Sequence, residues 1–137
     1  MYTCTHFKIQ ELVPPAMFEA RGEKAWELID DRVLITLDRL RDRYGPITVN
    51  NWHSGKDREW SGLRTPDSPY YSATSQHTFG RAADCIFHRT DAETVRRNLL
   101  ADQDDPAFEL ITSIELGVSW FHFDVRNCER IKAFHPG

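Results

Sequence analysis

The chain has 137 residues, of which 40% are hydrophobic and 28% are charged, and this composition is ordinary for one globular domain. Its formal net charge of -4 provides no overall basic field, so nucleic acid is not an expected partner. Because the sequence holds no run of about 18 apolar residues, it predicts no membrane span.

The N-terminus and the cysteines bear on where the chain is made. The segment MYTCTHFKIQELVPP lacks the basic start, apolar middle and small-residue cleavage site of a secretory signal. Cys4, Cys85 and Cys128 are odd in number and share no CxxC spacing, so we expect no disulfide framework. We therefore expect synthesis in the cytoplasm, with Cys85 as a small core residue.

The first half of the chain reads as helices followed by a strand and a loop. Pro14-Pro15 predicts the start of a short helix. Apolar residues spaced by three and four predict one long amphipathic helix over residues 23–44. A short strand is expected over residues 47–52, and a long loop over residues 53–74. Loops of that length in a compact domain are usually functional or disordered.

The second half predicts a strand over residues 81–88 and then a helix. Thr90 and Glu93 form a capping-box pattern, which opens a helix that runs to about Leu100. The stretches FELITSIEL and SWFHFDVRN read as two strands joined by a tight turn at Gly117. This order of elements indicates an α+β fold with a small, mostly antiparallel sheet and flanking helices.

Two segments place histidine and aspartate side chains where they can converge. Because alternate residues of a strand share a face, Trp120, His122 and Asp124 project together, while Phe121, Phe123 and Val125 form the natural core face. His77 and Asp84 lie on either side of Gly80, which lets the backbone turn so that both side chains can meet.

Imidazole nitrogen and carboxylate oxygen are ligands that zinc accepts, and a catalytic zinc keeps three protein ligands with one position open for water. Two histidines and one aspartate would leave the metal at net +1, which helps it acidify water and polarise a carbonyl. The pattern therefore predicts a metal site, although an isolated histidine or aspartate is more often structural.

The motifs that carry these residues resemble a known family. SQHTFGRAAD fits S-x-H-x-x-G-x-A-x-D, SWFHFD fits W-x-H-x-D, and SGLRTP is similar to an upstream SGYR segment. Together they resemble the D-alanyl-D-alanine carboxypeptidase family of zinc peptidases, which includes phage endolysins and murein endopeptidases and is grouped with lysostaphin-like enzymes and the hedgehog domain. The resemblance covers residues 49–126 and implies a hedgehog-like fold, with residues 1–45 as an N-terminal helical extension of one domain, 1–137.

The resemblance implies Zn²⁺ as the cofactor, held by His77, Asp84 and His122. Arg64 matches the family arginine that holds substrate or the developing oxyanion, work that suits a guanidinium near a metal. Ser75 matches the serine of the motif, which either makes a turn hydrogen bond or contacts substrate.

One position departs from the family pattern. Many members carry an acid three residues before the last histidine as general base, and Ser119 stands there instead. Glu115, before the Gly117 turn, or Asp124, two residues after His122, can take that role. We favour Glu115 as the base and give Asp124 an orienting or alternative-base role.

The function expected from this resemblance is a zinc peptidase that hydrolyses amide bonds in peptidoglycan stem peptides or crosslinks, as a monomer that acts at the cell wall after release. The alternative is a catalytically inactive zinc-binding structural or virion-associated protein, which the serine at position 119 would also fit. A third reading is an intracellular peptidase or amidase. Seven further residues either line the cleft or have surface or packing roles, and the sequence leaves both alternatives open: His53, His88, His135, Trp52, Trp60, Tyr70 and Tyr71.

Overall fold

The computed structural model describes residues 1–136. Within that range the chain forms α-helices, short 3-10 helices and strands in the order η1 (Ile9–Glu11), α1 (Pro15–Arg21), η2 (Gly22–Leu28), α2 (Asp31–Tyr44), β1 (Ile47–Thr48), η3 (Trp52–Ser54), η4 (Gln76–Phe79), β2 (Ala82–Phe87), α3 (Ala92–Ala101), β3 (Ser113–Glu115), β4 (Phe121–Asp124) and β5 (Lys132–Phe134). In the described range, no helix is both long enough and apolar enough to cross a membrane.

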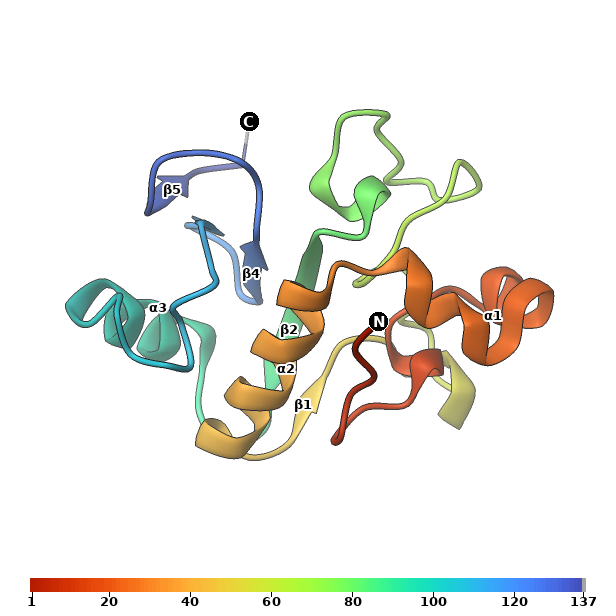
Figure 1. Ribbon diagram of the computed structural model, residues 1–137, viewed down its shortest axis with the longest axis horizontal. Helices are drawn as coiled ribbons and strands as arrows, with labels where there is room; N and C mark the ends of the chain where they lie inside the picture. Colours follow the sequence, from red (N-terminus) through yellow and green to blue (C-terminus); the bar gives the residue numbers. More distant parts are fainter. Residues whose placement is uncertain (137) are drawn as a thin grey trace.

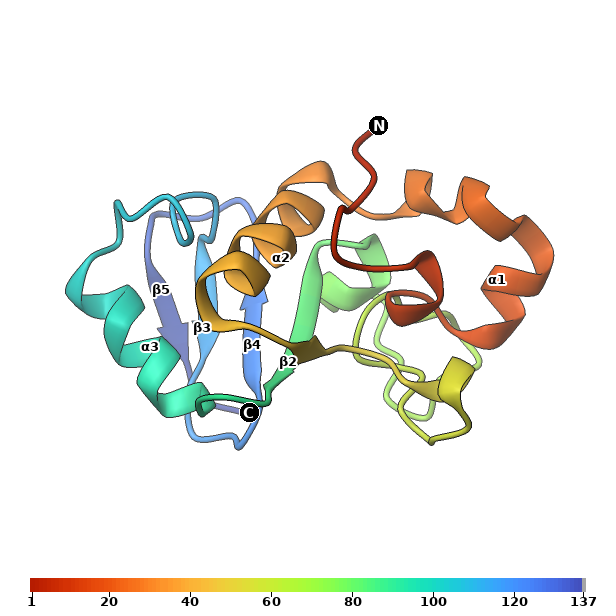
Figure 2. The ribbon, with the colours of Figure 1, turned by 90° about the horizontal axis from the view of Figure 1, so that it is seen from below.

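The strands of the described residues form one five-stranded sheet in the order β1-β2-β4-β3-β5. Figures 1 and 2 show this sheet with α2 and α3 packed beside it. Neighbouring strands are antiparallel except for β3 and β5, which run parallel. The expected α+β class with a small, mostly antiparallel sheet is thereby confirmed.

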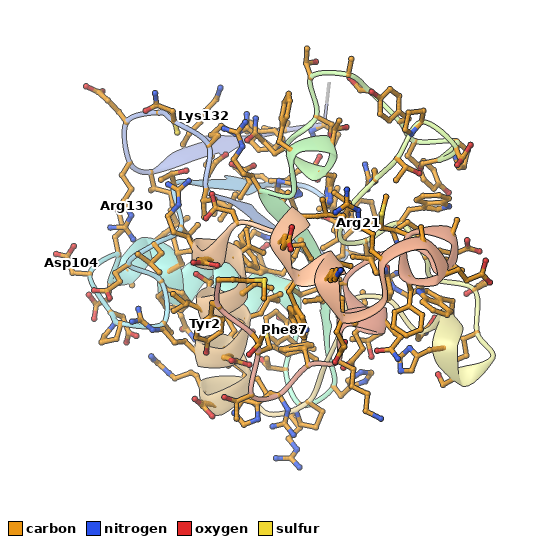
Figure 3. The ribbon with its side chains drawn as sticks, turned by 45° about the vertical axis from the view of Figure 1, so that its right-hand side comes forward. Tyr2, Arg21, Phe87, Asp104, Arg130 and Lys132 are labelled. Atoms are coloured by element: carbon orange, nitrogen blue, oxygen red, sulfur yellow. The ribbon has the colours of Figure 1, made fainter. Side chains whose placement is uncertain are left out.

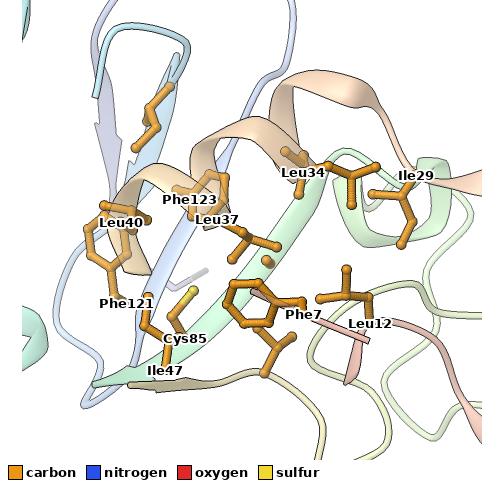
Figure 4. Packing of buried hydrophobic residues seen from close by; sticks show 14 of the residues in the cluster. Phe7, Leu12, Ile29, Leu34, Leu37, Leu40, Ile47, Cys85, Phe121 and Phe123 are labelled. Atoms are coloured by element: carbon orange, nitrogen blue, oxygen red, sulfur yellow. The ribbon is translucent and has the colours of Figure 1, made fainter. Parts of the chain in front are cut away.

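The hydrophobic core lies between α2, α3 and one face of the sheet. Phe121, Phe123 and Val125 are fully buried in it, as the alternation along this strand predicts. Figure 4 shows Leu37 and Leu40 of α2 facing these phenylalanines. His122 and Asp124, at the alternate positions of β4, are therefore left on the opposite face of the sheet.

The prediction of one unbroken helix over residues 23–44 is wrong, because the chain bends at Asp30. The carboxylate of Asp30 accepts a hydrogen bond from the Arg32 N–H and caps α2, while its own N–H donates to the carbonyl of Gly80. The side chain of an aspartate satisfies a free backbone N–H at the start of a new helix, whereas aspartate is an unfavourable residue inside a continuing helix. The preceding residues form η2 instead.

Two element boundaries also differ from the expected ones. The strand expected over residues 47–52 covers only Ile47–Thr48, since Asn50 uses its side chain to bind the Val13 carbonyl and the Ser61 N–H. The cap of α3 is Asp91 rather than Thr90, because the Asp91 carboxylate accepts from the backbone N–H of Thr94, the third residue of the helix.

Strand β5 is absent from the sequence-based expectation. Its residues pair in parallel with β3, where Glu115 lies opposite Phe134. The chain before it is anchored by Arg130, which donates to the carbonyls of Phe108 and Ile111 and lies 3.7 Å from Asp104 (Figure 3). The strand is too short and too polar to be recognised without its partner.

The N-terminal segment packs against α2 and shares the core of the sheet. Asp38, buried on α2, accepts hydrogen bonds from the hydroxyl of Tyr2 and the backbone N–H groups of Thr5 and His6 (Figure 3). Phe7 and Leu12 lie in the same hydrophobic cluster as the sheet residues. Residues 1–45 thus belong to the core of the fold.

Gly80 fixes the turn that carries η4 into β2. Its φ of +67° is in the left-handed region, as the sequence-based argument for a turn at this position requires. A Cβ atom at Gly80 would also collide with the backbone carbonyl of Leu28. Position 80 therefore has no room for a side chain. The hydrogen bond from the Asp30 N–H to the Gly80 carbonyl holds this turn against the bend between η2 and α2.

We predict that Gly80→Ala destabilises the fold by about 2–5 kcal/mol, because left-handed strain of about 1–2 kcal/mol adds to a backbone collision. The matched control is Gly55→Ala, since Gly55 has φ +86° but open space around its Cβ position. The control should cost only about 1–2 kcal/mol. Urea unfolding of both variants checks this, and equal losses would contradict the packing argument.

Candidate metal centre

The pairing of β2 with β4 places Asp84 directly opposite His122, on the face of the sheet away from the core. Directly opposed residues in an antiparallel pair have Cβ atoms only about 5 Å apart, so the carboxylate and the imidazole meet. The Gly80 turn, directly after η4, then brings His77, the second residue of η4, over the same two strands. Two strands and one short helix thus supply the three side chains.

The ligand atoms of these three side chains lie within 4.8 Å of one another, and all three residues are buried. The Oδ1 atom of Asp84 is 2.8 Å from Nδ1 of His122 and 3.3 Å from Nε2 of His77. The cluster could therefore hold a metal ion, as the sequence-based prediction requires.

The outward-facing nitrogen of each imidazole is fixed by a hydrogen bond. Nδ1 of His77 lies 2.8 Å from the carbonyl oxygen of Gly62, and Nε2 of His122 lies 2.8 Å from Oδ2 of Asp124. A carbonyl oxygen only accepts, so it selects the His77 tautomer that carries its proton on Nδ1. Nε2 of His77 and Nδ1 of His122 consequently face Asp84, which is the arrangement expected of metal-binding histidines whose second nitrogen is held by an acceptor.

The charges of the site favour a cation at its centre. Burial raises the pKa of Asp84, but the imidazoles of His77 and His122 outweigh this and lower it well below its usual range. Burial lowers the pKa of His122, yet hydrogen bonds to Asp124 and Asp84 raise it overall to about 9. The two carboxylates thus stabilise positive charge where the three ligand atoms meet.

Asp124 is fully buried, and its neighbours occupy both oxygens. Arg126 donates from Nε to Oδ1 and from Nη2 to Oδ2 at 2.8 and 2.7 Å, and Oδ2 also faces His122. Burial raises the pKa of Asp124, but the hydrogen bonds from His122 and Arg126 lower it overall. These contacts favour the orienting role for Asp124 over a role as general base.

A cleft of about 860 Å³ opens beside the cluster. The long loop before η4 forms one wall and the sheet forms the other, and the lining includes Arg64, Trp60, Tyr70, Glu115, Trp120, Phe134 and the three clustered residues. A cleft of this size can hold a drug-sized ligand. The long loop expected over residues 53–74 therefore covers the polar face of the sheet.

Glu115 lies in the same cross-strand row as the cluster. Ser113 pairs with Asp124 and Ile114 with Phe123, so one further step of this register puts Glu115 beside His122. Its side chain lines the cleft and makes no hydrogen bond or ion pair with any other residue in the range 1–136. This carboxylate is thus available to a bound ligand.

Arg64 and Ser75 both line the cleft, but they differ in how they are held. Arg64 donates from Nε to the carbonyl of Trp60 and from Nη2 to Asp84 at 3.2 Å, which leaves Nη1 without a partner in the described chain. Burial lowers the pKa of Arg64, against the opposing effect of Asp84. Ser75 accepts from the His77 N–H and caps η4, which favours its turn role.

The other candidates from the sequence separate in the structure. His53, His88 and His135 are exposed and lie outside the cluster. Trp52 donates to the Val13 carbonyl and pins the loop, whereas Trp60 and Tyr70 line the cleft. Sequence reasoning missed Arg126, Phe134 and Gly62, of which only Arg126 carried a signal, as a basic residue two positions after Asp124.

His77, Asp84 and His122 would hold a divalent ion with two neutral imidazoles and one carboxylate, and an ion that keeps net positive charge in this way would supply Lewis-acid chemistry beside the cleft. No protein-family model matches the chain, and no solved structure matches it. The chemistry assigned to this centre therefore rests on its own residues and on their geometry.

We predict that the protein binds one equivalent of Zn²⁺ and that His77→Ala abolishes this. The loss should exceed the roughly 10–100-fold that removal of an outer-shell partner costs, because a ligand itself is removed. The control is His88→Ala, an exposed histidine beyond the end of β2. Metal content after dialysis and a chelator competition measure both, and stoichiometric zinc in His77→Ala would contradict the ligand set.

Proposed function

We propose that the protein is a zinc-dependent peptidase that hydrolyses amide bonds in peptidoglycan stem peptides or crosslinks. The observation that carries the proposal is the His77–Asp84–His122 cluster, which borders a cleft that also presents Glu115 and Arg64. The motifs around these residues resemble those of the D-alanyl-D-alanine carboxypeptidase family, whose substrates are wall peptides. That resemblance supplies the substrate class.

Zinc is the metal that fits the donor set best, since two nitrogen ligands and one oxygen ligand are typical of its catalytic sites. When bound, it polarises the scissile carbonyl and acidifies water. The protein holds the donors ready for it, because hydrogen bonds to Gly62 and Asp124 already orient both imidazoles. The ligand nitrogens of both rings therefore already face Asp84, where the metal would bind.

Glu115 is the general base in this proposal. It lies beside His122 in the register of the sheet and has no competing partner among residues 1–136, so it can take a proton from the attacking water and pass it to the leaving amine. Asp124 is held by Arg126 and His122, and its work is to orient His122. Ser119 is exposed and cannot accept a proton at neutral pH.

Arg64 stabilises the carbonyl oxygen as it gains negative charge. Its guanidinium is fixed by the Trp60 carbonyl and by Asp84, so the remaining Nη1 donor has a defined position close to the metal ligands. A preorganised cationic donor of this kind acts on the transition state more than on the substrate. The same group can hold a substrate carboxylate in the ground state.

The aromatic side chains of the loop wall suit the rest of a wall peptide. Tyr70 is 65% exposed and lies 5.6 Å from the Arg64 guanidinium, and Trp60 lines the cleft beside it. Exposed rings at a cleft mouth bind the apolar faces of peptides and sugars with little loss of side-chain entropy. Trp60 and Tyr70 therefore belong to substrate binding in this proposal.

We predict that the purified, zinc-loaded protein cleaves peptides released from bacterial cell walls and that Glu115→Gln lowers kcat by about 10²–10⁴-fold. This variant should keep its zinc, because Glu115 is not a ligand, whereas His122→Ala should lose both zinc and activity. The matched control is Ser119→Ala, which should retain full activity. Release of new amino groups from purified walls measures all four proteins.

Two outcomes would overturn parts of this assignment. Wild-type turnover by Glu115→Gln would show that another group is the base. Stoichiometric zinc without cleavage of walls of any peptide chemistry would reject the enzyme and favour the non-catalytic zinc domain expected as the alternative.

A further inference from the structure

Phe134 contacts His122 from β5, a strand that supplies none of the three clustered residues. In the strand order, β3 lies between β5 and β4 (Figure 2). Phe134 pairs with Glu115 of β3, so its side chain must extend past Glu115 to reach His122. Its ring meets the His122 ring edge to face, with centroids 5.7 Å apart and planes at 81°. This separation and angle are those of a favourable aromatic pair.

The same ring also contacts the arginine that holds Asp124. The Arg126 guanidinium lies 4.8 Å from the centroid of Phe134, within the range of a cation–π interaction. Arg126 donates twice to Asp124, and Asp124 faces Nε2 of His122. Phe134 therefore contacts both ends of a series that runs from Arg126 through Asp124 to His122.

These contacts restrict a motion that the hydrogen bonds of His122 leave free. Asp124 holds Nε2 and Asp84 holds Nδ1, each at 2.8 Å, but the imidazole plane can still rotate about the line that joins the two nitrogens. Ring contacts with Phe134 and with His77, whose centroid is 5.2 Å from that of His122, restrict this rotation. Outer-shell groups of this kind orient metal ligands.

The position of Phe134 is itself fixed by β3. Its carbonyl accepts from the Leu116 N–H at 2.7 Å, and the Lys132 N–H donates to the Thr112 carbonyl at 2.9 Å. Arg130 holds the preceding chain to Phe108 and Ile111. The half-buried ring thus stands on an anchored strand, with one side left to line the cleft.

We propose that Phe134, acting with Arg126, is a positioning residue that sets the plane of the His122 ring toward the metal. The strand β5 is then part of the metal site, although it supplies no ligand. The inference rests on the metal centre of the proposed function, and it is independent of the reaction catalysed there.

The test compares Phe134→Ala, Phe134→Leu and Phe134→Tyr, with Lys132→Ala, an exposed residue two positions earlier in the same strand, as the control. We expect Zn²⁺ affinity to fall by about 10–100-fold in the alanine variant. The leucine variant keeps most of the volume without an aromatic ring and should recover little, whereas tyrosine should restore wild-type affinity. Chelator competition measures the affinities, and the visible spectrum of the Co²⁺-substituted protein reports the ligand geometry.

A purely structural role would lower the unfolding midpoint of the metal-free variants but leave Zn²⁺ affinity and the Co²⁺ spectrum unchanged in the folded protein. That result, or equal affinities for the leucine and tyrosine variants, would overturn the proposal. If the alanine variant does not fold, the leucine–tyrosine comparison still decides. A wild type that binds zinc without cleaving walls would reject the peptidase while leaving this comparison intact.

Discussion

Two hydrogen bonds that point away from the metal position decide what the site can bind. An imidazole that rotates by half a turn offers either nitrogen, and only an acceptor behind the ring selects one of them. The Gly62 carbonyl does this for His77, and the Asp124 carboxylate does it for His122. Gly62 can approach because it has no side chain, since a Cβ there would collide with the Leu12 carbonyl.

The sheet supplies the rest of the geometry through its register. Asp84 faces His122 across β2 and β4, and the same row continues through Glu115 of β3 to Phe134 of the edge strand β5. A shift of one residue in any pair would move its side chains to the core face, where apolar packing forbids them. The packing of Phe121 and Phe123 thus fixes the site on the opposite face.

The three residues of the cluster could be singled out from the sequence because their spacing and strand alternation are local, and their role as zinc ligands, which the resemblance implies, stays a prediction. The buried aromatic face of β4 and the turn at Gly80 followed from the same local rules. The supporting residues could not be predicted this way, since Gly62 and Phe134 reach the histidines only through loop packing and a parallel strand pair. The break at Asp30 was missed because apolar periodicity continues across it while the backbone hydrogen bonds do not.

The way the site opens separates a catalytic metal from a structural one. A structural zinc is usually closed by four protein ligands, whereas in residues 1–136 three ligands meet beside a cleft. Burying Asp84 and Asp124 with their partners costs free energy that an apolar cluster of similar volume would not cost. If these residues only stabilised the fold, an apolar cluster would serve better. Stability alone also gives no reason for the unpaired Glu115 beside His122. The proposed catalysis would account for the buried charge, the open side and the free carboxylate together.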